Sequence, residues 1–586
     1  MKLVNAIASS VSLAFAIFHQ DGEMKRKSAV AAIRRLYNLP DELSDGDDST
    51  ETFDRENETA HVEDPTSSCD DESGSDDDQP LRERLARNDP ELRAIFDINE
   101  SNLRGRDGTL WSEIPSGTTC GQTSLHNIMR IAPGPTSYAC SRIVRGSPLS
   151  AWRVLFDETI LRNIRRCTLA EASRQMNDEW DLSLHDLEKT FGLLYAKGLL
   201  MSSKTSVRLL WSEKWAPPLF SKTMTRDRFY SIMKNLRFDE KQTRSERLQQ
   251  DKFALASALW TPFIENCRKC FNPYENLTID EQLLPCKCRC RFIQYMANKP
   301  DKFGLKFFIL ADVKTKYVVN AIPYLGKFDD RPQDEGLGLH IVKKLSSPIE
   351  NNGHNITADN FFTSLEVVRH LREKKTSYIG TIRSNRRELP DINEVMKHKP
   401  VYESQFLRSD DSVSLTLYKV KKNRTVSLLS TLHPSPSIPL PESEKRKPDV
   451  ILDYNVTKCG VDCFDSMARS YTTRCTSRRW PLYVLYNVLD ICGINSWILY
   501  QQVTQQNITR RDFLFELIQE LTSPPHGPQS SSANEVAKKN ATKRRRCSLQ
   551  ACDNKTSTIC VKCERACCGL HTFEKITTVR CQNCAV

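Results

Sequence analysis

The sequence predicts an α/β core, preceded by a helical region and followed by a cysteine-rich tail. Apolar residues recur at helical spacing from Ser147 to Leu200, as in AWRVLFDETILRNIRRCTLAEA. From Leu277 onward they form strand-like runs that alternate with helical ones, the order typical of a sheet packed against helices. Eight cysteines then fall between Cys547 and Cys584.

The strand-like runs begin with LTIDEQLL, KFGLKFFILADV and KYVVNAIPYL, the last two joined by a polar turn at Val313–Lys316. GLHIVKKLSSPI predicts a short helix, and HNITADNFF predicts a strand that ends in polar residues. LEVVRHLREKK predicts a helix whose start has capping-box spacing, with Thr363 as the cap and Glu366 as its partner. SYIGTIRS predicts the next strand. The Lys-, Ser- and Pro-rich residues 386–448 are interpreted as an insertion, before helical patterns return in GVDCFDSMARSY and LYVLYNVLDICGINSWILY.

Charge is distributed unevenly along the chain. The net charge is +10, yet residues 41–79 hold seventeen acidic residues against one basic residue, which leaves about +26 on the rest. This acidic, Ser-rich stretch has little apolar content and is expected to be disordered. A body this basic favours a polyanionic partner, with an ordinary solvated surface as the alternative.

Two apolar segments raise the question of export or a membrane. Met1–Gln20 mimics a secretory signal, with small residues at Ala14–Ala16, but the acidic stretch after it argues against export. Leu482–Gln502 contains Asn487, Asp490 and Asn495, so a buried core helix is expected rather than a membrane span.

Acidic residues stand at positions suited to metal-dependent phosphodiester chemistry, in which carboxylates hold Mg²⁺. Asp280 lies inside the apolar strand pattern LTIDEQLL, where a charge is costly without a partner. Asp359 ends the strand pattern HNITAD. Asp462 and Asp465 are three residues apart and would share one helix face.

Structural roles are the alternative for each of these acids. An aspartate at a strand end is often only a cap or turn residue, and Asp462 and Asp465 could be first-turn acids favoured by the helix dipole. Asp312, in LADVKTKY, is expected to be such a turn aspartate.

The cysteine-rich tail has ligand pairs at zinc spacing. Eight soft ligands in pairs suit two tetrahedral Zn²⁺ ions, and a module of about 40 residues needs metal to fold. Disulfides, the alternative, would require export. The predicted ligands are Cys547, Cys552, Cys560, Cys563, Cys568, His571, Cys581 and Cys584.

Neither the ligand pairing nor the choice between Cys567 and Cys568 is fixed by the sequence. A cross-brace would place Cys547, Cys552, Cys568 and His571 on one ion and the remaining four ligands on the other. The basic run from Lys538 to Arg546, just before the tail, is typical of a nuclear import signal or a phosphate-contacting arm.

Long segments of the chain closely resemble the catalytic core of piggyBac-type transposases. They include LTIDEQLL, NKPDKFGLKFFILADVKTKYVVNAIPYLGK, HNITADNFFTS, GTIRSNRRELP and YNVTKCGVDCFDSMARSYTTRCTSRRWPLYVLYNVLDICGINSWI. The likeness runs in order from about Ser147 to Tyr500 and resumes in the terminal cysteines. The tail departs from the family in its x4 spacing between Cys547 and Cys552 and in the long gap before Cys581.

The resemblance implies a ribonuclease-H-like core of the DDE type, with flanking helical and zinc-binding domains. The expected divisions are 1–140 (disordered, acidic), 141–270 (helical dimerisation and DNA-binding domain), 271–385 (first part of the core), 386–450 (β-rich insertion domain), 451–522 (second part of the core and helical DNA-binding part), 523–546 (basic linker) and 547–586 (zinc module).

The resemblance also implies residue roles. Asp280, Asp359 and Asp462 match the catalytic aspartates, and Asp465 matches an additional metal-site aspartate, together binding Mg²⁺ or Mn²⁺. TSRRWP resembles the stretch near the DNA junction, so Arg478, Arg479 and Trp480 would contact DNA, with an ordinary core tryptophan as the alternative for Trp480. Asn360 would help at the target site. The family does not use Cys267, Cys270, Cys286, Cys288 or Cys290 as ligands, and free thiols are expected there.

The implied activity is cut-and-paste transposition by a nuclear homodimer acting on double-stranded DNA, with no membrane and no small-molecule substrate. Water nicks one strand at each element end, the freed 3′-OH makes a hairpin, and the reopened end joins a TTAA target. Two other hypotheses stay open: a domesticated, catalytically silent DNA-binding derivative, and a zinc cross-brace protein that recruits a ubiquitin-conjugating enzyme.

Overall fold

The computed structural model of the 586-residue chain describes residues 102–114, 128–175, 180–200, 206–297, 299, 301–439 and 444–523, with short stretches between 545 and 581. The chain divides into two compact units, Met1–Asn88 and Asp89–Val586, and every described residue belongs to the second. The acidic stretch and most of the basic linker lie outside the described residues.

The helices of the described part are α5 (Ser137–Cys140), α6 (Pro148–Arg153), α7 (Glu158–Gln175), α8 (Leu184–Leu200), η3 (Val207–Trp211), α9 (Leu219–Thr223), α10 (Arg226–Asn235), α11 (Arg244–Gln250), α12 (Ala254–Cys270), α13 (Leu337–Ser346), η4 (Ser347–Ile349), α14 (Leu365–Glu373), α15 (Ile392–Met396), α16 (Asp449–Thr457), α17 (Gly460–Ser470), α18 (Trp480–Thr504) and α19 (Arg510–Thr522). Residues 141–270 are therefore mainly helical, as their apolar spacing predicts.

The strands are β1 (Asn102–Arg104), β2 (Leu110–Glu113), β3 (Gly134–Pro135), β4 (Phe271–Asn272), β5 (Asn276–Pro285), β6 (Ile293–Tyr295), β7 (Phe303–Asp312), β8 (Val318–Pro323), β9 (Asn355–Ala358), β10 (Ser377–Thr381), β11 (Ser404–Ser409), β12 (Ser414–Lys421), β13 (Arg424–Ser430), β14 (Arg545–Arg546), β15 (Lys555–Thr556), β16 (Thr572–Lys575) and β17 (Val579–Cys581). Each strand pattern named above, from LTIDEQLL to SYIGTIRS, contains one of these strands, whereas Cys286, Cys288 and Cys290, expected on a strand, lie between β5 and β6.

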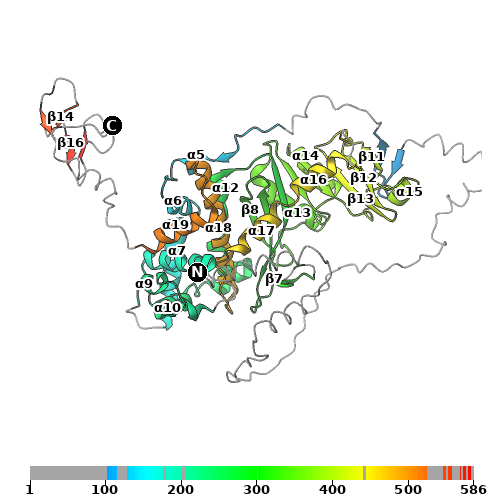
Figure 1. Ribbon diagram of the computed structural model, residues 1–586. Coiled ribbons are helices and arrows are strands. Elements are labelled where there is room, and N and C mark those ends of the chain that lie inside the picture. Colours follow the sequence, from blue (N-terminus) through cyan, green and yellow to red (C-terminus); the bar gives the residue numbers. More distant parts are fainter. Residues whose placement is uncertain are drawn as a thin grey trace, which may run out of the picture. The chain divides into compact units, whose positions relative to one another are not determined.

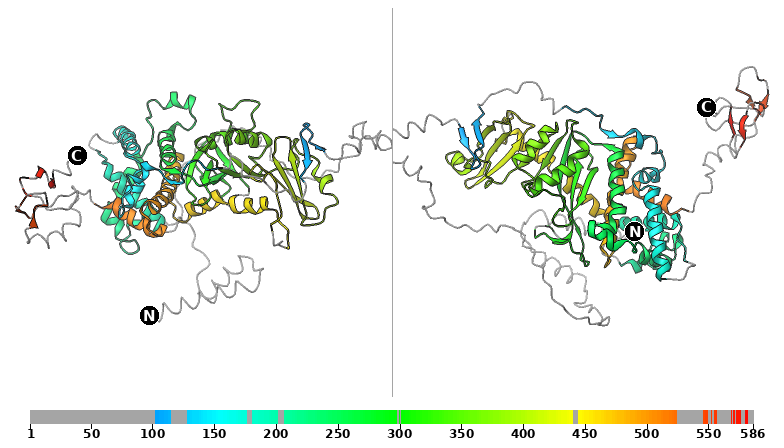
Figure 2. Two further views of the ribbon diagram at one scale, coloured as in Figure 1. Left: turned by 90° about the horizontal axis from the view of Figure 1, so that it is seen from above. Right: turned by 180° about the vertical axis from the view of Figure 1, so that it is seen from behind.

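One mixed sheet organises the core (Figure 1). Its strands run β1-β2-β11-β12-β13-β10-β9-β5-β7-β6, and β8 pairs with β7. β5, β9 and β10 are parallel to one another, whereas β7 is antiparallel to β5. Figure 2 shows α16 and α17 (yellow) along one face of the sheet and α13 and α14 (green) along the other. Helices on both faces bury the central strands, which agrees with their nearly continuous apolar sequence.

The insertion extends the core sheet. Ile379–Thr381 of β10 pairs antiparallel with Leu428–Ser430 of β13, so that β11, β12 and β13 continue the sheet outward. β2 then adds to β11 at the edge. The disorder predicted for the whole of residues 1–140 is therefore wrong for Asn102–Glu113. Trp111 is fully buried there, and its indole N–H donates to the Glu388 carbonyl at 2.8 Å.

Two local predictions have opposite outcomes. Asp312 accepts hydrogen bonds from Thr315 N (2.7 Å), Thr315 Oγ1 (2.6 Å) and Tyr274 N (2.9 Å), which confirms its role as a turn aspartate. The predicted cap of α14 is wrong by one residue, because Ser364 accepts from Val367 N. Thr363 is fully buried and donates instead to the Asp359 carbonyl at 2.7 Å.

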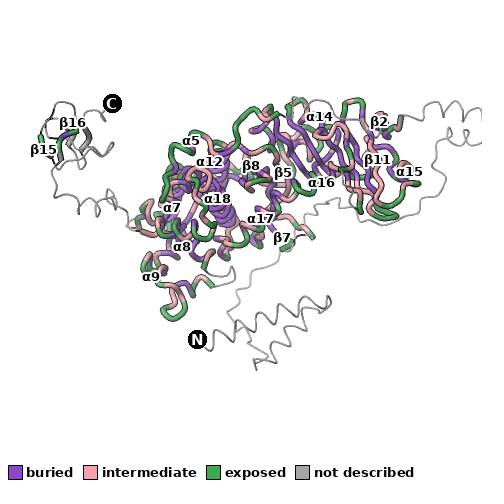
Figure 3. The backbone as a smooth tube through the Cα atoms, turned by 45° about the horizontal axis from the view of Figure 1, so that its top comes forward, coloured by how far each residue is buried: buried purple, intermediate pink, exposed green. Residues whose placement is uncertain are grey.

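Helix α18 is the core of the helical region. It packs against α6, α12, α17 and α19. By length and composition it could cross a membrane, but 94% of its most apolar window is buried inside the protein, as predicted for a core helix (Figure 3). Asn495 is fully buried in it, and its side-chain amide accepts from Val318 N and donates to Val318 O, both at 3.0 Å. This amide joins the helix to the backbone of β8.

Replacing Asn495 by leucine should destabilise the fold, because Val318 would then lose both hydrogen-bond partners in a buried place. The expected loss is about 2–3 kcal/mol of unfolding free energy, measured by denaturant titration. Asn507→Leu, at an exposed position, is the matched control and should stay within about 0.5 kcal/mol of the parent protein. Equal effects of the two changes would contradict the bridging role of Asn495.

Candidate active site

Two predicted aspartates lie side by side on neighbouring parallel strands. The register pairs Ile279 of β5 with Ala358 of β9, which places Asp280 beside Asp359, the residue that follows β9. Adjacent strands are about 4.8 Å apart, so Asp280 and Asp359 are side-by-side neighbours on the sheet. One turn-forming contact holds Asp359, whose Oδ1 accepts from Phe361 N at 3.0 Å.

Helix α17 is held against these strands by a cluster of threonines. Thr278 and Thr357, each two residues before an aspartate, are register partners. Thr278 Oγ1 donates to the Thr457 carbonyl at 2.5 Å, and Thr357 Oγ1 donates to Thr457 Oγ1 at 2.8 Å. Gly460, at the start of α17, fits directly over Thr278, since a Cβ there would lie 2.8 Å from Thr278 Oγ1. The end of α16 and the start of α17 are thereby fixed to β5 and β9.

A second residue on the same face of β5, Gln282, also contacts α17. Thr278, Asp280 and Gln282 alternate along the strand and point to one side. Gln282 Nε2 donates to Asp465 Oδ1 at 3.0 Å. Asp462 lies three residues before Asp465 on α17, so the two share a helix face, and the charge of Asp462 contributes to the raised pKa of Asp280. The structure therefore brings the predicted aspartates Asp280, Asp359 and Asp462 to one site.

The electrostatics of Asp280 and Asp359 are unfavourable in the absence of a cation. Burial, followed by the charge of Glu281 and those of Asp359 and Asp462, raises the pKa of Asp280 to about 8. Burial and Glu281 also raise the pKa of Asp359, against hydrogen bonds from Phe361 and Phe362 N–H groups and the charge of Arg383. The contributions of Asp359 and Asp462 to the raised pKa of Asp280 agree with a shared site for the three carboxylates.

A divalent cation fits this set of residues. Partly buried carboxylates that repel one another supply the hard oxygen ligands that Mg²⁺ or Mn²⁺ prefers. Within the described part of the chain, three or more potential ligand atoms approach within 4.8 Å of one another only in the group Cys547, Cys552 and Cys568. The aspartates do not form such a group in the described part of the chain.

Comparisons with known proteins agree with this geometry. A family model described as Transposase IS4 matches residues 147–497, which include all four aspartates. The chain belongs to this transposase family, on its piggyBac branch.

Its relatives include a transposase of known structure and two human proteins. The cryo-EM structure of the piggyBac transposase synaptic complex with hairpin DNA is 30% identical, with a TM-score of 0.63, and the match covers 78% of this chain and all of that one. Human PiggyBac transposable element-derived protein 3 is 23% identical over 449 residues, 74% of this chain and 73% of the relative. The human Chimeric ERCC6-PGBD3 protein is also 23% identical, but the chain spans only 41% of its length.

Asp465, the fourth of the predicted site aspartates, is held by hydrogen bonds within the protein. Both oxygens of Asp465 already have partners, Gln282 Nε2 on Oδ1 and Arg469 Nε on Oδ2 at 2.9 Å. Arg469 also pairs with Asp301 at 3.2 Å. Asp465 is therefore bonded to the strand that carries Asp280, two residues further along, with its carboxylate oriented by hydrogen bonds, and its role as a metal ligand stays a prediction.

The residues predicted to contact DNA differ in their surroundings. Trp480 is half-buried, with ring centroids 5.4 Å from Phe253 and 5.0 Å from Phe292, so it packs in an aromatic cluster. Arg479 donates to the carbonyls of Leu236 (2.9 Å) and Met233 (2.5 Å) at the end of α10. Arg478 is exposed, and the exposed Asn360 accepts from Arg383 Nε at 3.4 Å.

Some residues that shape the site were not predicted from the sequence. They are Glu281, Gln282, Thr278, Thr357, Gly460, Thr457 and Arg383. Alternation in the strand could have singled out Gln282, since it lies two residues from Asp280 on the same face. The role of Thr457 depends on contacts between distant segments, which one sequence does not show.

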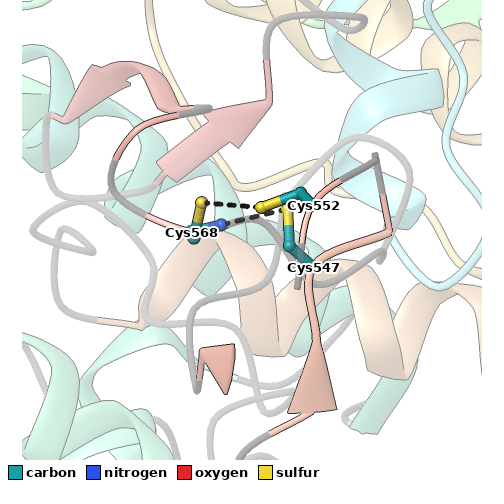
Figure 4. A group of neighbouring side chains, drawn as sticks. All are labelled: Cys547, Cys552 and Cys568. Atoms are coloured by element: carbon teal, nitrogen blue, oxygen red, sulfur yellow. Dashed lines mark hydrogen bonds between the residues drawn. The ribbon is translucent and has the colours of Figure 1, made fainter. Parts of the chain in front are cut away.

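In the cysteine tail, the structure describes one group of thiols (Figure 4). Sγ of Cys552 lies 3.7 Å from Sγ of Cys568, and Cys568 N donates to Cys547 Sγ at 3.4 Å. These three are three of the four ligands predicted for one ion of the cross-brace, and they fit a tetrahedral Zn²⁺ site that takes a fourth ligand. Cys560, Cys563, His571 and Cys584 lie outside the described residues, and Cys581 is described only as the end of β17.

The remaining cysteines noted in the sequence agree with the expectation of free thiols. Cys267, Cys270, Cys286, Cys288 and Cys290 are all free. Burial raises the pKa of the Cys267 thiol above its ordinary range and that of Cys270 to about 12. Neutral, buried thiols of this kind behave as small apolar side chains.

The raised pKa of Asp280 gives the metal-free protein a characteristic pH dependence. A carboxyl group whose pKa is higher in the folded state stabilises the fold at low pH and loses that contribution as pH rises toward about 8. Without metal, Asp280→Asn should therefore gain at least about 1.4 kcal/mol over the parent protein between pH 5 and pH 8, the equivalent of one pKa unit. Denaturant titrations in EDTA measure this, and identical pH profiles for the two proteins would refute it.

Proposed function

We propose that this chain is a metal-dependent DNA transposase that cleaves and joins strands at Asp280, Asp359 and Asp462. The observation that carries the proposal is the alignment of these acids, supported by the β5–β9 register and by the contacts of Thr457, at the end of α16, just before α17. The core order β8-β7-β5-β9-β10, with parallel β5, β9 and β10, supports the ribonuclease-H-like fold that such chemistry uses.

Each acid would have a defined task. Asp280 and Asp359, on the sheet, and Asp462, on α17, would bind Mg²⁺ or Mn²⁺. Asp465, also on α17, would be an additional acid of the metal site. Bound divalent ions supply activation of the attacking oxygen and stabilisation of the leaving oxygen. The acids would hold the ions in place while the attacking oxygen is first that of water and then that of a 3′-OH. Cleavage, hairpin formation and joining at TTAA could then occur at one site without a protein–DNA covalent bond.

DNA is the proposed partner, bound by a homodimer in the nucleus. The solved relative is a piggyBac transposase in a synaptic complex with hairpin DNA, and the match covers the whole of that transposase chain. The exposed Arg478, directly before α18, and the net positive charge outside residues 41–79 support a phosphate-binding surface. We further propose that the eight tail ligands hold two Zn²⁺ ions, that the tail binds DNA, and that the basic run before it directs nuclear import.

A catalytically silent DNA-binding derivative is the second candidate. It is favoured by the human relative, which is described as transposable element-derived. It predicts DNA binding without strand cleavage, so the two candidates separate in a single assay.

Purified protein should cleave DNA that carries its own genomic element ends when Mg²⁺ or Mn²⁺ is present, and should not do so in EDTA. Asp359→Asn should reduce cleavage at least about 100-fold, because removing a partner of a metal ligand already costs 10–100-fold. DNA binding by Asp359→Asn should be preserved, measured by mobility shift.

Asp410→Asn is the matched control, since Asp410 is an exposed aspartate on the insertion. It should cleave as the parent protein does. Binding of the element ends with no cleavage by the parent protein would reject the transposase proposal in favour of the derivative.

The zinc proposal predicts two Zn²⁺ ions per purified chain, measured by elemental analysis. Cys552→Ala should lower the content to about one, since three remaining ligands bind Zn²⁺ poorly in a structural site. Cys140→Ala, at an exposed thiol in α5, should leave the zinc content unchanged. A zinc content that does not respond to Cys552→Ala would remove that residue from the ligand set.

A further inference from the structure

A buried glutamine lies inside the acidic site. Gln282 is 2% exposed and belongs to the same face of β5 as Asp280. A buried amide is costly unless its polar ends are paired, so its partners show what holds it there. Those partners are one residue on each of the two helices, α17 and α18, that pack around the site.

The hydrogen bonds of Gln282 fix its amide in one orientation. Asn487 Nδ2, 1% exposed on α18, donates to Gln282 Oε1 at 2.9 Å. Gln282 Nε2 then donates to Asp465 Oδ1 at 3.0 Å. Since a carboxylate only accepts, Gln282 presents its NH₂ group to Asp465 on α17 and its carbonyl oxygen to Asn487 on α18.

This relay determines where Asp465 points. Gln282 holds one carboxylate oxygen and Arg469 holds the other at 2.9 Å. The close approach of Gly460 to Thr278 fixes the start of α17, and the Gln282 contact with Asp465 fixes a point further along it. Two fixed points prevent the helix from rotating about its axis, and Asp462 lies between them.

We propose that Gln282 is a positioning residue that sets the rotation of α17, and with it the approach of Asp462 and Asp465 to Asp280. This inference rests on the proposed metal-dependent function of the site, and it assigns no contact between Gln282 and substrate. A glutamate of the same shape would keep an acceptor for Asn487 but would place a negative charge against Asp465. That change should misplace α17 while leaving the packing of β5 intact.

The test is a double-mutant cycle read by Mn²⁺ binding in calorimetry and by DNA cleavage, on the full chain. Gln282→Glu should weaken Mn²⁺ binding and cleavage about 10–100-fold, the range found for partners that orient metal ligands. In an Asp465→Asn background, the same change should cost less than about threefold, because an asparagine can donate to Glu at position 282. The cleavage loss should lie in kcat, with KM for DNA unchanged.

Gln405→Glu, the same change on β11 of the insertion, is the matched control and should alter neither readout. Equal losses from Gln282→Glu with and without Asp465→Asn would overturn the proposal, and so would a fall in thermal stability that accounts for the lost binding. A parent protein that binds Mn²⁺ but cleaves no DNA would refute the proposed function, while the Mn²⁺ cycle would still decide the role of Gln282.

Discussion

The attachment of α16 and α17 to two parallel strands determines the arrangement of the acidic site. Thr278 and Thr357 hold Thr457 from adjacent strands, at distances of 2.5 and 2.8 Å. Each threonine lies two residues before an aspartate, so the strand period that brings the hydroxyl groups together also aligns the carboxylates. Thr457 follows the insertion in sequence, yet it contacts both β5 and β9, which precede it. The insertion extends the sheet from β10, so it leaves these contacts intact.

Three shielded aspartates, Asp490, Asp312 and Asp280, have different surroundings, and the difference separates structure from proposed function. Asp490 is buried, and its pKa is raised to about 7 by burial, but it accepts from Thr473 N, Thr472 Oγ1 and Thr473 Oγ1. Asp312 is satisfied in the same way by its turn. Asp280 instead accepts from the N–H of the next residue, Glu281, and is surrounded by other carboxylates. Shielding from water is common to all of them, whereas repulsion by neighbouring carboxylates distinguishes the place where we propose a bound cation.

The sequence predicted the local elements and the aspartates, because these follow from periodicity and from motifs within one segment. The β7–β8 hairpin, β9 and α18 have their expected places. The contacts that a single segment does not encode were missed. β2 joins β11 across nearly three hundred residues, and α14 is capped by Ser364 because Thr363 is drawn to the Asp359 carbonyl. Gln282 lay in a recognised motif, but its function depends on Asn487 and Asp465, which only the folded chain brings to it.

The polar residues of α18 explain how a helix apolar enough for a membrane serves the acidic site. Asn487 orients Gln282, Asp490 holds the Thr472–Thr473 segment that follows α17, and Asn495 binds the backbone of β8. An apolar surface alone would allow the helix to slide or rotate against the sheet at little cost, since its contacts are not directional. Three polar groups with fixed partners permit only one alignment. The helical region, the sheet and α17 therefore keep fixed positions relative to one another, and these positions determine where the carboxylates lie.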